Sequence, residues 1–242
     1  MVANVEPAAL RRLLELQQED SAIKQLLHRR ESLPEARELL EVNERLAELT
    51  SDLEIATKQF EEAGREQSRL EGEISLIDEK IGREEQRMFS GGVSNPKELS
   101  ALQAEVESLK RKKGGIEDHL LEILVQKDQA FATLESIRDE HGITEARSKE
   151  LSETVGRLTE DIEADLGVHR DQRDKIAPDI PPDLLTLYDK IREQKAGIGA
   201  AALVGGTCEG CHTQLPAKEV ERLRAEGGLQ RCDNCRRILV IA

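Results

Sequence analysis

The sequence predicts a mainly α-helical protein, in which a long antiparallel coiled-coil hairpin is followed by a small C-terminal module with short β-strands. Three observations support this fold class. Apolar residues recur at alternating steps of three and four along two long segments, the spacing of a left-handed coiled coil. A short segment containing glycine, asparagine and proline separates them. All four cysteines lie near the end of the chain, in two Cys-x2-Cys motifs.

The composition is unlike that of an ordinary globular domain. Charged residues make up 35% of the 242 residues and aromatic residues only 2%, with no tryptophan. A compact core normally draws much of its buried area from aromatic side chains. A chain rich in Leu, Glu, Ala, Arg and Lys is more typical of long helices that pack through narrow seams.

The charge and the terminal sequence indicate the compartment and the partners to expect. A formal net charge of −14 should repel nucleic acid and anionic membranes from the molecule as a whole. The first residues lack the apolar core of a signal peptide, and the longest mostly apolar run, residues 196–207, is too short to span a bilayer. We therefore expect a cytoplasmic protein without a membrane partner, whose cysteines bind metal rather than form disulfides.

The first arm of the predicted hairpin runs from residue 39 to residue 88, about 75 Å at ~1.5 Å per residue. Its seam contains only two polar residues, Gln67 and Glu84. The seam consists of Leu39, Val42, Leu46, Leu49, Leu53, Ala56, Phe60, Ala63, Gln67, Leu70, Ile74, Ile77, Ile81, Glu84 and Met88.

A turn near residues 89–96 should end the first arm, because two glycines, Asn95 and Pro96 stand there. Asn95 can cap a new helix that has Pro96 at its first position. A second seam then keeps its register to residue 162. Its members are Leu99, Leu102, Val106, Leu109, Lys113, Ile116, Leu120, Ile123, Lys127, Ala130, Leu134, Ile137, His141, Thr144, Ser148, Leu151, Val155, Leu158 and Ile162.

Three regions are expected along the chain. Residues 1–177 should form the coiled-coil hairpin, with a bend where Pro34 interrupts one arm and the seam turns polar at residues 141–148. Residues 178–198 should form a Pro-rich linker and a short helix that packs against the base of the hairpin. Residues 199–242 should form the cysteine-containing module.

The cysteine motifs allow three interpretations when the first is read alone: a haem attachment site, half of a zinc site, or a redox pair. Cys208, Cys211, Cys232 and Cys235 form C-x2-C, a gap of twenty residues, and C-x2-C, close to the spacing of four-cysteine zinc sites. A haem site would leave the second motif without a role, and a redox pair normally lies in a βαβ unit. We therefore predict one structural zinc ion held by four thiolates, which leaves no open coordination position for catalysis.

The residues around the cysteines complete the prediction of a zinc ribbon. The stretches "IGAAALV" and "RRILVIA" are expected to be short strands, and "PAKEVERLRAEG" a short helix that starts at a proline and stops at glycines. Gly210 and Asn234 occupy the third position of each motif. Because both residue types tolerate left-handed backbone, we expect that conformation there.

The whole chain resembles a bacterial family of proteins with an N-terminal coiled-coil hairpin and a C-terminal C4-type zinc ribbon. The resemblance rests on "SNPKEL" with the following "LQAEVESLK", and on the tail "C-x2-C … LP … C-x2-C-RRIL". His212 and Arg236 depart from the glycine that follows many zinc knuckles. The resemblance implies the same four zinc ligands and a non-enzymatic partner of other macromolecules. Some members are linked to flagellar or secretion-system regulation through an alternative sigma factor, and to RNA binding.

Two classes of function remain open. An adaptor would bind partner proteins through the coiled coil and the ribbon, with Phe89 and Val93 at the turn as candidate contacts. A nucleic-acid-binding regulator would use the basic run at residues 110–113 or a cluster of ribbon arginines, although the ribbon has no aromatic residue for base stacking. Those arginines are Arg222, Arg224, Arg231, Arg236 and Arg237. Because no catalytic constellation is present, we expect neither enzymatic activity nor a small-molecule substrate.

Overall fold

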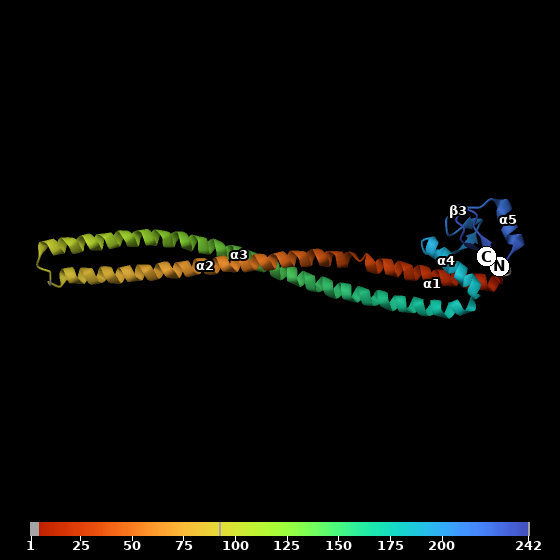
Figure 1. Cartoon of the computed structure of the whole chain (residues 1–242), viewed down its shortest axis with the longest axis horizontal. Coiled ribbons are helices and arrows are strands. Elements are labelled where there is room, and N and C mark those ends of the chain that lie inside the picture. Colours follow the sequence, from red (N-terminus) through yellow and green to blue (C-terminus); the bar gives the residue numbers. More distant parts are fainter. Residues whose placement is uncertain (1–4, 92, 242) are drawn as a thin grey trace. The chain divides into compact units, whose positions relative to one another are not determined.

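A computed structural model describes residues 5–91 and 93–241, which form two compact units (Figure 1). One unit contains the chain up to Arg37 and from Ser152 onward, and the other contains Glu38–Leu151. The helices are α1 (Pro7–Glu31), α2 (Pro34–Phe89), α3 (Pro96–Ile176), a 3-10 turn (Ala177–Asp179), α4 (Pro182–Gln194) and α5 (Ala217–Glu226). The strands are β1 (Ala200–Val204), β2 (Thr207–Cys208), β3 (Thr213–Gln214), β4 (Gln230–Arg231) and β5 (Ile238–Ile241).

The unit of residues 38–151 is an antiparallel pair formed by α2 and α3, as predicted (Figure 1). Ion pairs between the helices show the antiparallel register, because residue numbers fall along α2 as those of the partners rise along α3. They join Arg87 to Glu98, Lys80 to Glu105, Arg45 to Glu140 and Glu38 to Arg147. Such exposed pairs stabilise little individually. The stabilisation comes from the seam, since every predicted seam residue is buried or half-buried.

Several polar residues of the seam have hydrogen-bond partners on the facing helix. The ammonium group of Lys127 donates to Gln67 at 2.8 Å, and the Ser148 hydroxyl donates to Asn43 at 2.6 Å. The imidazole of His141 lies 3.2 Å from the Thr50 hydroxyl. These bonds pair polar side chains inside the seam, whereas Oε2 of the seam residue Glu84 is buried without a hydrogen-bond partner.

The turn between α2 and α3 follows the predicted chemistry. The side chain of Asn95 accepts a 3.0 Å hydrogen bond from the amide of Lys97, which caps α3 at its first turn. Gly91 adopts a positive φ of 76°. Phe89, the last residue of α2, is 84% exposed, whereas Val93 is half-buried.

One bend was predicted, where Pro34 and the polar seam residues 141–148 fall at the same level of the hairpin. The chain leaves the helical conformation between Glu31 and Pro34, where α1 ends and α2 begins. At residues 141–148, by contrast, α3 continues without interruption. His141 and Ser148 have hydrogen-bond partners on α2 there, and the bend expected at this level stays a prediction.

The second unit has its core where α1 meets the C-terminal elements. Its buried residues come from α1, the segment around the 3-10 turn, α4, β1 and β5: Val5, Ala9, Leu10, Leu13, Leu16, Ile180, Leu184, Tyr188, Ile191, Ala200, Ile238 and Val240. Residues of α1 also face the end of α3, where Arg30 pairs with Glu163 and Glu19 accepts from His169 at 2.6 Å.

The compact units differ from the domain boundaries expected from the sequence, 1–177, 178–198 and 199–242. The first helix and the last residues of α3 belong with α4 and the ribbon rather than with the rest of the hairpin. The reason is the shared core, since Leu13 and Leu16 of α1 become fully buried in a cluster that includes Ile238 of β5.

The ribbon is a five-stranded sheet in the order β3-β2-β1-β5-β4. The expected strands around the cysteine motifs are present as β1 and β5, which pair in parallel. The other neighbouring strands pair antiparallel. Helix α5 covers this sheet through Val220 and Leu223 and ends at Gly227, as the sequence predicted.

Candidate metal centre

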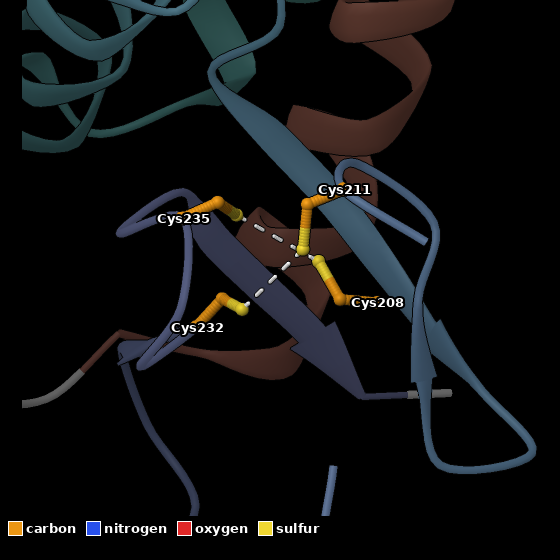
Figure 2. A group of neighbouring side chains, drawn as sticks. All are labelled: Cys208, Cys211, Cys232 and Cys235. Carbon is orange, nitrogen blue, oxygen red and sulfur yellow. Dashed lines mark hydrogen bonds between the residues drawn. The ribbon is translucent and has the colours of Figure 1, made fainter. Parts of the chain in front are cut away.

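Four cysteines from two turns converge on one point (Figure 2). Cys208 ends β2 and Cys211 lies in the turn before β3, while Cys232 follows β4 and Cys235 lies in the turn before β5. Their sulfur atoms all lie within 4.8 Å of one another. Two of the pairs, Cys208–Cys235 and Cys211–Cys232, are 3.9 Å apart.

These distances match a tetrahedral zinc site. A zinc–sulfur bond of about 2.3 Å places the sulfurs of a tetrahedron about 3.8 Å apart. Two of the thiols, on Cys208 and Cys232, are fully buried, and the other two are half-buried. With four thiolates the coordination shell is closed, so the ion would stabilise the fold and offer no position for a reacting water.

Each cysteine motif is closed by backbone hydrogen bonds to its first cysteine. The amide of His212 donates to the carbonyl of Cys208 at 2.7 Å, and the amide of Arg236 donates to that of Cys232 at 2.8 Å. These donors are also the residues with left-handed backbone, with φ of 54° at His212 and 63° at Arg236. The turn therefore needs a positive φ directly after the second cysteine.

The expectation of left-handed backbone at Gly210 and Asn234 was wrong, because neither has a positive φ. A glycine is required at position 210 because its neighbours leave no room for a side chain. A β-carbon there would lie 2.8 Å from Cδ of Arg237 and 2.9 Å from Cβ of Ala201. Asn234 serves through its side chain, which donates to the Thr213 hydroxyl at 2.8 Å and contacts the Cys211 sulfur at 3.7 Å.

Burial and hydrogen bonding shift the pKa values of the thiols in opposite directions. Burial raises the pKa of Cys208 to about 12 and also raises the pKa of Cys232. The side chain of Thr213 lowers the pKa of Cys211 to about 6. A bound divalent cation would reverse the effect of burial, because its charge favours the thiolate form of every ligand.

The structure gives most of the predicted ribbon arginines partners within the chain. Arg222 pairs with Glu219 at 2.5 Å and with Glu226 at 3.3 Å, and Arg236 lies 3.6 Å from Asp233. Arg237 donates to the carbonyls of Ile198 and Lys195. Arg224 and Arg231 form no ion pair with the described residues.

The basic run at residues 110–113 lies on α3, facing acidic residues of α2. Lys110 pairs with Glu85 at 2.7 Å, Lys112 with Glu73 at 3.1 Å and Lys113 with Asp78 at 2.6 Å. These carboxylates neutralise much of the positive charge that a phosphate backbone would require.

Two polar residues of α1, Gln17 and Asp20, hold the ribbon and α4 in place. Neither residue was identified from the sequence. Gln17 accepts a 2.7 Å hydrogen bond from the amide of Gly199 and donates to the carbonyl of Gly197 at 3.0 Å. Asp20 accepts from Tyr188 at 2.7 Å, and Arg173 and Arg192 each approach it at 2.9 Å. Both residues continue the spacing of the apolar positions Leu10 and Leu13 on α1, and that spacing was the available signal.

The fold and the metal centre define a coiled-coil hairpin protein with a four-cysteine zinc ribbon. Residues 16–196 match the CT398-like coiled coil hairpin domain, and residues 207–239 match the C4-type zinc ribbon domain. The chain belongs to this family, and the resemblance stated above is confirmed. The family match and the clustered thiols together indicate one structural zinc ion.

Relatives and solved structures agree with this assignment. The protein Rv2229c of Mycobacterium tuberculosis is 31% identical over 179 residues, which cover 72% of this chain and 71% of the relative. A structure from Mycobacterium smegmatis has a TM-score of 0.83 at 22% identity and covers 99% of this chain and 100% of its own. CT398 from Chlamydia trachomatis has a TM-score of 0.66 at 20% identity, covering 97% and 98%. These two similarities establish the fold alone.

Across the described residues, no helix combines the length and apolar character needed to cross a membrane.

Proposed function

We propose that this protein is a non-enzymatic adaptor that binds partner proteins through its coiled-coil hairpin and its zinc ribbon. The observation that carries the proposal is Phe89, a large apolar side chain that is 84% exposed at the turn of the hairpin. An aromatic residue in this position is a typical anchor for a protein partner. Val93, four positions later in the same turn, is half-buried.

The scaffold around Phe89 fits this role. The seam residues of α2 and α3 are covered by each other, so the hairpin needs no further helix to bury them. Its outward faces and its turn are therefore available to other proteins. The ribbon offers a second rigid surface, because a closed zinc site fixes its two turns.

We place the role in the regulation of transcription or secretion, on the strength of the family resemblance. A site of four thiolates fits a reducing compartment, and we therefore propose the cytoplasm as its location.

Site-specific photo-crosslinking tests the proposal. A photoreactive residue at position 89 should give discrete crosslinked proteins in cells, whereas the same residue at position 76 should not. Leu76 is a matched control, since it is also an exposed apolar residue of α2 (66%) but does not lie at the turn. A Phe89→Ser variant should lose partners in affinity capture that Leu76→Ser retains. Identical recovery with the parent and Phe89→Ser would contradict a role for the turn.

Binding of RNA or DNA is the rival function. The internal partners of Arg222, Arg236, Arg237 and the lysines of α3 favour a protein partner instead. A gel-shift titration at two salt concentrations separates the two classes. Tight binding that weakens steeply with salt would favour nucleic acid, because it reports the release of counterions from phosphates.

A further inference from the structure

A groove of about 530 Å³ lies between α1 and the outer side of the ribbon. Its apolar lining comes from both ends of the chain: Leu10 and Leu14 of α1, Leu223 of α5, and Val240 and Ile241 of β5. Leu14 and Ile241 are only half-buried, so they expose apolar surface to the groove. This volume is within the range of pockets that hold a ligand or a peptide side chain.

Two arginines, one from each helix, give the groove its charge. Arg11 projects from α1 and Arg224 from α5, and both line the groove. Neither forms an ion pair with the described residues, whereas neighbouring Arg12 pairs with Glu15 and Arg222 pairs with Glu219 and Glu226. The guanidinium groups of Arg11 and Arg224 are thus not engaged by a described carboxylate and can pair with those of a ligand.

None of the described residues that line this groove carries a carboxylate, which is unusual for a chain with 49 acidic residues. Four other grooves on the described residues each include an acidic side chain, such as Glu66, Asp179, Glu209 or Glu41. The groove between α1 and α5 therefore combines an apolar floor with two arginines that pair with no described carboxylate. Those properties complement a segment that carries both apolar side chains and carboxylates.

We propose that this groove binds an acidic amphipathic segment of a partner protein, with an apolar side chain on its floor and carboxylates on Arg11 and Arg224. The inference rests on the proposed adaptor function and specifies the chemistry of one partner surface. A protein segment fits better than nucleic acid, because the lining contains no aromatic side chain on which a base could stack. Gly227 and Gly228 also line the groove and have no side chain that would block a peptide backbone.

Fluorescence anisotropy with the full-length zinc-loaded protein tests the proposal. The probe is a labelled helical peptide of about 14 residues, with leucines at the i, i+3, i+4 spacing and glutamates elsewhere. It should bind the parent saturably, and the double variant Arg11→Glu/Arg224→Glu should bind about 10-fold more weakly. Lys218→Glu is the matched control, because it reverses an exposed charge on α5 outside the groove; it should change affinity less than about 2-fold.

A charge-swapped peptide, with lysine in place of each glutamate, provides the complementary test. It should bind the double variant better than it binds the parent. Zinc content and helical circular dichroism of each variant should equal those of the parent, which excludes unfolding as the cause. No saturable binding of the acidic peptide, or equal binding by parent and double variant, would overturn the proposal. Tighter binding of a single-stranded RNA with the same sensitivity to both substitutions would also overturn it.

The results separate this inference from the adaptor function itself. If cells yield partners that Arg11→Glu/Arg224→Glu captures as well as Lys218→Glu does, the groove proposal fails and the adaptor function stands. If the acidic peptide binds as expected while no crosslink forms at Phe89, the hairpin part of the adaptor proposal fails and the groove proposal stands.

Discussion

The phenol of Tyr188 donates a 2.7 Å hydrogen bond to the carboxylate of Asp20, although 168 positions separate the two residues in the chain. Tyr188 is fully buried and Asp20 is 3% exposed. Arg173 and Arg192 also approach this carboxylate at 2.9 Å. A single acidic side chain of α1 therefore connects the end of α3 with α4.

Removing the phenol should destabilise this connection without breaking the charge balance. Tyr188→Phe should lower the free energy of unfolding by about 1–2 kcal/mol, since one buried acceptor loses a donor while both arginines remain. Asp20→Asn should cost more, about 3 kcal/mol, because it removes the nearer of the two carboxylates that Arg173 and Arg192 share and leaves only Asp189, at 3.7 and 3.6 Å. Urea unfolding of the two variants measures both values. A smaller loss for Asp20→Asn than for Tyr188→Phe would contradict this account.

Alkaline pH should weaken the fold through the same residue. Burial and, secondarily, the bond to Asp20 raise the pKa of Tyr188 above its ordinary value. Above pH ~10 the unfolded chain therefore loses the phenolic proton while the folded protein keeps it, so stability falls with rising pH, by at most about 1.4 kcal/mol per pH unit. Tyr188 is the single tyrosine of the chain, so ultraviolet absorbance of tyrosinate reports on it alone. The signal should appear only on unfolding, and Tyr188→Phe should lack this pH dependence.

Loss of a zinc ligand should unfold the ribbon and leave the hairpin intact. Cys208→Ser or Cys235→Ser should lower bound zinc from about one ion per chain to a small fraction, measured by elemental analysis. Hydrogen exchange should then accelerate in β1 and β5 but not in residues 38–151, which form a separate compact unit. His212→Ala is the control and should retain zinc, because four thiolates already complete the shell. Full zinc occupancy in Cys208→Ser would refute the four-thiolate assignment.

Adding one methyl group at Gly210 should disturb the first cysteine turn. Gly210→Ala should cost about 1–3 kcal/mol, because the new β-carbon would meet Ala201 and the side chain of Arg237. Thermal unfolding and zinc retention against a chelator would measure the effect. A neutral result would show that these neighbours move aside at little cost.

Replacing exposed glycines of the long helices by alanine should have the opposite effect on stability from Gly210→Ala. A β-carbon at Gly72, Gly115 or Gly142 would have no neighbour within 4 Å. Replacing each by alanine should stabilise the hairpin by about 0.5–1 kcal/mol, because alanine restricts the unfolded chain and favours the helix. Urea unfolding followed by circular dichroism checks this prediction. Destabilisation by any of these substitutions would indicate a contact at that face.

The hairpin was predictable because its information is repeated along the chain. Each seam residue strengthens the same register, so a single polar member such as Gln67 or Lys127 does not obscure the pattern. The zinc ligands were predictable for a related reason, since the ion requires four thiolates at a spacing that two tight turns can satisfy.

The packing of the ribbon could not be predicted from local patterns. The parallel pairing of Ala200–Leu203 with Ile238–Ile241 depends on residues that are distant in sequence. Gln17 and Asp20 occupy core positions of α1 because their partners come from Gly199 and Tyr188. The sequence prediction placed the left-handed residues at Gly210 and Asn234, because glycine and asparagine adopt that conformation most easily. The structure has it at His212 and Arg236, whose amides form the hydrogen bonds that close the two turns.

The shared core of α1 with Tyr188 and Ile238 has a consequence for biosynthesis. The ribosome makes α1 before the residues that bury Leu13 and Leu16, such as Tyr188 and Ile238, more than 150 positions later in the chain. The helices of residues 38–151 have all their seam partners earlier and can assemble during translation. The apolar face of α1 therefore stays uncovered until α4, β1 and β5 have been made, so chaperone binding to nascent chains should concentrate on α1.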